Sequence, residues 1–77
     1  MVTRCKFYCE SVAKIWNAWD KKFVYKATFR AVTSGSEENK KFFAYTPQGE
    51  LSVTVNDDVI FESGKEYYLD IQESVIA

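Results

Sequence analysis

Apolar and polar positions alternate with a period of two over much of the chain, most regularly in residues 50–56 and 66–72. The apolar positions of these two runs are Leu51, Val53, Val55, Tyr67, Leu69 and Ile71. Successive side chains of a β-strand leave opposite faces, so this alternation predicts two half-buried strands. The remainder of the chain is expected to cover the apolar face that they form.

Two longer strands are predicted upstream, at residues 3–12 and 22–33. In the first, Cys5, Phe7 and Cys9 alternate with charged or polar residues and are expected in the core. In the second, the apolar face consists of Phe23, Tyr25, Ala27, Phe29 and Ala31. This face is expected to pack in the same core.

The two cysteines, Cys5 and Cys9, lie on one predicted strand, which separates their Cα atoms by about 13 Å. A disulfide requires Cα atoms within about 7 Å, so both thiols are expected to be free and buried, in a reducing compartment. The chain has no histidine and no further cysteine. A zinc site is therefore not expected, because the usual tetrahedral ligand set is missing.

Residues 11–20 fit two structures. One is a short helix, capped by Ser11, with an apolar stripe at helical spacing. The stripe consists of Val12, Ile15, Trp16 and Trp19. The other is a long hairpin with its turn at residues 16–19, and the strands predicted on both sides favour it. In either structure two tryptophans lie near a chain reversal, where they cap the core, stack on a ligand or anchor an interface.

A fifth strand is predicted at residues 41–46, where aromatic side chains fall on both faces. A polar loop of residues 33–39 precedes it, and the turn Thr46-Pro47-Gln48-Gly49 follows it. Asn56 is suited to cap a short helical turn at residues 57–62, before the last strand.

These elements predict one all-β domain over residues 1–77, with about five antiparallel strands and one short helical turn before the last strand. The strand number and length fit a small barrel or sandwich of the SH3-like or OB-like kind, or a curled sheet that a partner completes. A core this small favours self-association, so a homo-oligomer is expected.

Charge is distributed unevenly along the chain. Residues 1–41 carry nine Lys and Arg against four Asp and Glu, whereas residues 42–77 carry one Lys against seven Asp and Glu. On the strand predicted at 22–33, a basic stripe lies opposite the aromatic face and consists of Lys22, Lys26 and Arg30. Three arrangements explain such a pattern: ion pairs across the sheet, a basic surface for an anionic ligand, or head-to-tail pairing of subunits.

Short motifs are distributed along the chain: Arg4-Cys5-Lys6, Ala31-Val32, Glu38-Asn39-Lys40, Thr46-Pro47 with Gly49, and Phe61-x-x-Gly64-Lys65-Glu66-Tyr67-Tyr68-Leu69-Asp70. Together they resemble a group of small proteins encoded by tailed bacteriophages and prophages. The resemblance covers most of the chain outside residues 11–22. It implies a phage origin and action in the host bacterial cytoplasm or in the virion, and it carries over no catalytic residue.

Several chemistries lack their usual residues. Without histidine the chain lacks the commonest general base, and three glycines do not make a phosphate-binding loop. No apolar run follows Arg4 and Lys6 as in a signal peptide, and no stretch of about 18 apolar residues would span a membrane. The sequence therefore predicts a binding protein that is not an enzyme and that uses no metal or cofactor.

The favoured ligand is a nucleotide or single-stranded nucleic acid, including a host-defence signalling nucleotide that a phage protein would sequester. The candidate binding residues are basic or aromatic: Lys22, Lys26, Arg30, Lys40, Lys41, Trp16, Trp19, Phe43 and Tyr45. An isoelectric point near 5.3 favours a small nucleotide over a long polyanion. The alternative is a structural or interaction protein of the virion, or a binder of a host protein, in which the aromatic residues anchor an interface.

Overall fold

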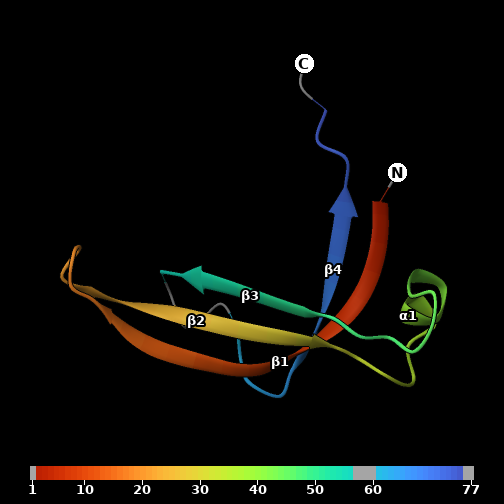
Figure 1. Cartoon of the computed structure of the whole chain (residues 1–77), viewed down its shortest axis with the longest axis horizontal. Coiled ribbons are helices and arrows are strands. Elements are labelled where there is room, and N and C mark those ends of the chain that lie inside the picture. The colour runs from red at the N-terminus through yellow and green to blue at the C-terminus, as the bar shows by residue number, and fades with distance from the viewer. Residues whose placement is uncertain (1, 57–60, 76–77) are drawn as a thin grey trace.

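The computed structural model describes residues 2–56 and 61–75, which form one antiparallel sheet and one short helix (Figure 1). The elements in chain order are β1 (Val2–Asn17), β2 (Lys22–Ala31), α1 (Glu37–Phe42), β3 (Glu50–Val55) and β4 (Glu66–Gln72). The strands lie in the order β3-β2-β1-β4, so β1 and β2 are central. The prediction of an antiparallel all-β fold is confirmed.

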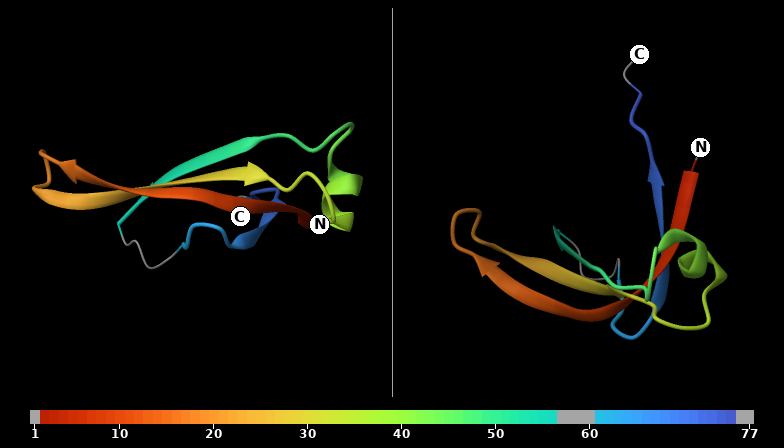
Figure 2. Two further views of the ribbon diagram at one scale, coloured as in Figure 1. Left: turned by 90° about the horizontal axis from the view of Figure 1, so that it is seen from below. Right: turned by 45° about the vertical axis from the view of Figure 1, so that its right-hand side comes forward.

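Strand β1 determines the shape of the sheet, because it pairs with two different strands along its length. Its first part pairs with β4 from Val2 to Tyr8, and its second part pairs with β2 from Phe7 to Asn17. Figures 1 and 2 show that the first part of β1 runs beside β4, at an angle to the arm formed by the other strands. The sheet is therefore bent into two arms that share β1.

A β-bulge in β1 keeps apolar side chains on one face of this bent strand. The register with β2 shifts between Cys9 and Ser11, which leaves Glu10 as the extra residue. After the shift, Val12 takes the side of the sheet that Cys9 occupies before it, and it packs against the core. A bulge of this kind also adds local bend and twist to the strand.

The tryptophan-containing segment forms a hairpin and not a helix, but the turn lies at residues 18–21 instead of the predicted 16–19. Strand β1 continues to Asn17 instead of ending near residue 12. The Asn17 side chain closes the turn, since its Oδ1 accepts hydrogen bonds from the backbone N–H of Trp19 at 3.0 Å and of Asp20 at 3.4 Å. An asparagine that bonds the backbone two residues further on is a frequent turn former.

The fifth strand predicted at residues 41–46 is wrong. Helix α1 occupies Glu37–Phe42, and residues 43–49 form no strand. Ser36 caps the helix, because its Oγ accepts a hydrogen bond from the backbone N–H of Asn39 at 3.2 Å. Acidic side chains in the first turn and basic ones in the last complement the helix dipole. These local signals outweigh the strand preference of the aromatic residues that follow.

The described strands form an open sheet. Hydrogen-bonded pairs join β1 to β2, β1 to β4 and β2 to β3, which leaves β3 and β4 at the two edges. The predicted five-stranded barrel or sandwich is therefore not confirmed in this part of the chain. The helical turn predicted at residues 57–62 falls largely on residues 57–60, which lie outside the described residues.

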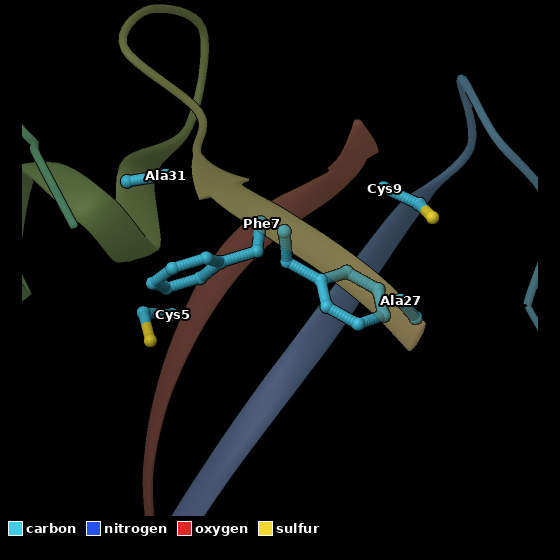
Figure 3. Close-up of a cluster of buried hydrophobic side chains, with 6 residues drawn as sticks. Cys5, Phe7, Cys9, Ala27 and Ala31 are labelled. Carbon is cyan, nitrogen blue, oxygen red and sulfur yellow. The ribbon is translucent and has the colours of Figure 1, made fainter. Parts of the chain in front are cut away.

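The core lies on one face of the sheet (Figure 3). Its buried side chains are Cys5, Phe7, Cys9, Ala27, Phe29 and Ala31. The Phe29 ring meets the rings of Phe61 and Tyr67 edge-to-face, with centroids 4.9 Å and 5.9 Å away. The core face predicted for β1 is confirmed, and so is that of β2 from Ala27 to Ala31. Both cysteines are buried free thiols.

The apolar positions predicted for β3 and β4 lie on the same face but are less covered. Along β3 they are half-buried and alternate with exposed polar residues. Along β4, Tyr67 and Leu69 are half-buried, whereas Ile71 is exposed. The predicted alternation is therefore confirmed, while full burial of this face is not reached within one chain.

The side chain of Asn39 joins α1 to the sheet. Its Oδ1 accepts a hydrogen bond from the backbone N–H of Lys6 at 2.6 Å, and its Nδ2 donates to the carbonyl oxygens of Lys6 at 2.7 Å and Val32 at 2.8 Å. Asn39 is 1% exposed. Because β2 ends at Ala31, this carboxamide satisfies backbone groups that another pair of the β1–β2 ladder would otherwise satisfy.

Replacing Phe29 by alanine is expected to lower the free energy of unfolding by about 3–5 kcal/mol, because the buried ring would leave a cavity beside Phe61 and Tyr67. Chemical denaturation followed by circular dichroism measures this change. Thr28→Ala is the matched control, since Thr28 lies on the opposite face of β2, and it should cost less than about 1 kcal/mol. A loss below about 1 kcal/mol for Phe29→Ala would show that the faces of β2 are assigned backwards.

Replacing the buried Asn39 by alanine is expected to cost about 3 kcal/mol, because the part-buried N–H of Lys6 and C=O of Val32 both lose their partner. Amide hydrogen exchange at Lys6 gives a local readout and should become faster in this variant. The control is Lys40→Ala, an exposed position of the same helix, which should stay within about 0.5 kcal/mol. Indistinguishable stabilities would mean that the carboxamide does not hold the bend.

Candidate ligand-binding surface

The predicted binding residues lie in three separate parts of the molecule. The first group is Trp16, Trp19, Lys22 and Lys26. It lies on the outer half of the β1–β2 hairpin, residues 13–26, which we call the distal hairpin. Arg30 lies at the other end of β2, and the remaining candidates lie on α1 or just after it. Figures 1 and 2 show the distal hairpin and α1 at opposite ends of the molecule, so the structure brings together only the first group.

The group around α1 does not converge on one site. Its members are Lys40, Lys41, Phe43 and Tyr45. Lys40 Nζ lies 3.4 Å from Glu37 Oε1 of the same helix. Phe43 is half-buried and packs against the core, edge-on to the ring of Phe42. Tyr45, in the segment before β3, is 91% exposed.

Ion pairs between strands neutralise basic side chains near the bend of the sheet. Arg30 Nε lies 2.8 Å from Glu10 Oε2, and Arg30 Nη2 lies 3.8 Å from Glu50 Oε2. The hydrogen bond to Glu10 raises the pKa of the Arg30 guanidinium further. Lys6 and Glu66 form another pair, 3.6 Å apart. In this region the uneven charge of the sequence is resolved by pairing across the sheet.

The distal hairpin keeps an excess of positive charge. Its charged residues are Lys14, Asp20, Lys21, Lys22 and Lys26. In the part of the chain that the structure describes, none of its lysines forms an ion pair. Lys22 Nζ donates a hydrogen bond to Asn56 Oδ1 at 3.2 Å. The predicted basic stripe of β2 is therefore divided, with Arg30 neutralised and its two lysines on the hairpin that carries the excess charge.

Exposed aromatic rings lie on one face of the distal hairpin together with Lys14, whereas Lys22 and Lys26 lie on its other face. Trp16 pairs with Phe23 across the hairpin, and their rings meet edge-to-face with centroids 5.0 Å apart. Lys14 Nζ lies 4.2 Å from the centre of the Phe23 ring, a cation–π contact. Trp16 is 54% exposed, and Trp19, in the turn, is 95% exposed. The distal hairpin thus offers exposed rings on which a planar group can stack beside Lys14, with the other lysines at the turn and on the opposite face.

Two of these contacts are missed by reasoning from the sequence. The sequence assigns Phe23 to the core because it shares a face with Phe29, but the core ends before the hairpin tip and the Phe23 ring is 45% exposed. Lys14 lies in the ambiguous segment and outside the basic stripe. In a hairpin with its turn at residues 18–21, the register places Lys14 and Trp16 beside Phe23. A correct prediction of this register would have identified Phe23 and Lys14 as surface residues of the site.

Two cavities lie away from the distal hairpin. One, of about 240 Å³, opens on the apolar face of the sheet and is lined by Phe7, Phe29, Leu51, Val53, Phe61, Tyr67, Tyr68 and Leu69. The other, of about 220 Å³, lies beside Arg30 and the Pro47–Gly49 turn. Neither is lined by a residue of the distal hairpin.

Burial raises the pKa of both cysteine thiols, Cys5 and Cys9, so both are protonated at neutral pH. Among residues 2–56 and 61–75, no three His, Cys, Asp or Glu side chains gather into a group that would hold a metal ion. In the same part of the chain, no helix combines the length and apolar character needed to cross a membrane.

Comparisons with protein-family models, with curated protein sequences and with solved structures give no match. The function is therefore inferred from the residues of the distal hairpin and of the sheet.

The stability contributed by the ion pair between Arg4 and Asp70 depends on pH. Arg4 donates hydrogen bonds to both carboxylate oxygens of Asp70, at 2.6 Å and 3.0 Å, and thereby lowers the pKa of that carboxyl. The stability from this pair is present above the unfolded pKa of aspartate, about 3.9, and is lost as pH falls through the lower folded pKa.

Arg4→Gln is expected to raise the pKa of Asp70 toward its ordinary value, which carboxyl NMR titration measures directly. Lys14→Gln removes a cation from the distal hairpin and serves as the control that leaves this pKa unchanged. If the Asp70 pKa stays low in Arg4→Gln, another group holds the carboxylate.

Proposed function

We propose that the distal hairpin binds a ligand that contains both bases and phosphates, and that the protein is a phage-encoded, non-enzymatic binding protein. The observation that carries this proposal is the joint exposure of Trp16, Phe23 and Trp19 on a hairpin whose lysines form no ion pair in the described part of the chain. Lys14 lies at the Phe23 ring, and Lys22 and Lys26 lie on the opposite face of the same two strands. Aromatic rings stack on bases of any sequence, and nearby lysines attract the phosphates.

The shape of the site favours a segment of single-stranded nucleic acid over an enclosed nucleotide. The rings lie on a projecting hairpin, and the two cavities described above lie elsewhere. A strand can lay successive bases on such rings, whereas a small nucleotide gains most from a pocket that surrounds it. A formal net charge of −1 limits attraction to a long polyanion, so a short contacted segment is expected.

The proposal predicts binding of a fluorescent oligothymidine strand, followed by anisotropy and by quenching of tryptophan emission. Trp19→Ala should weaken binding roughly 10-fold, because stacking contributes about 1–3 kcal/mol per base. Lys22→Ala with Lys26→Ala should weaken it and reduce its salt dependence, which for about three contacted phosphates has a slope near −2.

The matched controls lie around α1. Tyr45→Ala removes another fully accessible ring, and Lys40→Ala with Lys41→Ala removes another pair of lysines, so neither should alter binding. A parallel titration with ATP and with cyclic dinucleotides separates a strand from a free nucleotide as the ligand. No binding of either class at low salt, or equal losses in the controls, would contradict the proposal.

A second candidate function, an interaction protein of the virion or a binder of a host protein, is favoured by a different observation. The apolar face of the sheet is only partly covered, and exposed aromatic rings act as anchors in protein interfaces. An interface of this kind persists at high salt, whereas phosphate binding weakens steeply.

A further inference from the structure

The apolar face of the sheet is the largest feature that ligand binding at the hairpin does not explain. Its cavity lies between the outer strands, and its walls include Leu51 and Val53 of β3, Leu69 of β4, and Phe61. These four side chains are half-buried. Helix α1 contributes no residue to the lining. In the part of the chain that the structure describes, the sheet is therefore the only layer at this face. Domains normally bury an apolar sheet face against a second layer.

The exposed area of the whole chain, to which the projecting hairpin and this face both contribute, is larger than that of a compact monomer. The accessible surface is 6082 Å² for 8.9 kDa, while a compact monomer of this mass exposes about 4,800 Å². The excess of about 1,300 Å² exceeds the roughly 800 Å² that each partner contributes to a standard interface. The radius of gyration, 14.8 Å against about 11.5 Å for a compact domain, agrees with an incompletely covered structure.

The chemistry of the face indicates what covers it. No residue that lines the cavity is charged. The hydroxyl of Tyr67 already accepts a hydrogen bond from the backbone N–H of Glu62 at 2.9 Å. An uncharged apolar face is complementary to a copy of itself, because a two-fold contact brings no like charges together. The opposite face carries the ion pairs described above and suits contact with water.

We propose that two copies of this chain pack their apolar faces together about a two-fold axis, with Val53 and Leu69 near the centre of the contact. If the core of one chain is incomplete, another molecule must cover it, and that molecule must be present in the same amount as the protein itself. A second copy of the chain meets this requirement. The contact adds the second layer that the open sheet lacks, and it is independent of ligand binding at the distal hairpin.

The test is sedimentation velocity over a range of protein concentrations, with native mass spectrometry to give the composition. The expected result is a complex of two chains without additional mass. Two variants place the same charge on opposite faces of β3: Val53→Glu on the apolar face and Ser52→Glu on the other. Val53→Glu should weaken the dimer roughly 10-fold or more, and Ser52→Glu should leave it unchanged.

If circular dichroism shows that Val53→Glu does not fold, a second pair of variants provides the same test. Ile71→Glu and Gln72→Glu repeat the comparison on β4, where Ile71 is 47% exposed in the single chain and tolerates a charge. A monomer at all concentrations, or a different molecule on this face, overturns the proposal. A dimer that persists in folded Val53→Glu, or in Ile71→Glu where Val53→Glu fails to fold, also overturns it.

Discussion

Three hydrogen bonds from one buried carboxamide hold the structure at the place where β1 changes partners. Asn39 bonds both backbone polar groups of Lys6 and the carbonyl oxygen of Val32. Without these bonds, the part-buried N–H of Lys6 and C=O of Val32 would lack their partner and α1 would lose this attachment to the sheet. A side chain from a helix of six residues thus stabilises the place where the two arms meet.

The bend and the bulge together separate two surfaces of different character. Glu10, the bulged residue, pairs with Arg30 and neutralises positive charge near the core, whereas the lysines of the distal hairpin form no ion pair with any residue that the structure describes. The same bulge returns Val12 to the apolar face, so that face continues along β1 toward the hairpin. The proposed second chain is centred on the part of this face between β3 and β4, whereas the proposed strand of nucleic acid lies at the hairpin tip, which contributes no residue to the cavity.

Local pattern predicts the strands well and the candidate surface only in part. Period-two alternation locates β3 and β4 almost to the residue, because each has one apolar and one polar face. Helix α1 has local signals, a Ser36 cap and charges that complement its dipole, but the aromatic residues after it favour a strand more visibly. The contact that attaches the helix to the sheet, from Asn39 to Lys6, joins residues far apart in the sequence and has no local signal. Judged by residue type alone, Arg30 belongs with the hairpin lysines. Its charge is neutralised by carboxylates of other strands, which the sequence around Arg30 does not reveal. Such contacts become visible only when the register is known.

The pairing of β1 with β4 has a consequence for how the chain folds during synthesis. The β1–β2 hairpin is local and forms from neighbouring segments, but the first part of β1 waits for residues 66–72. Contacts between distant segments are slow to form, because the chain loses the entropy of loop closure before the contacts contribute favourable free energy. Until β4 is made, half of β1 and the apolar face stay open to the wrong partners. A nascent chain of this protein is therefore expected to depend on chaperones more than its small size suggests.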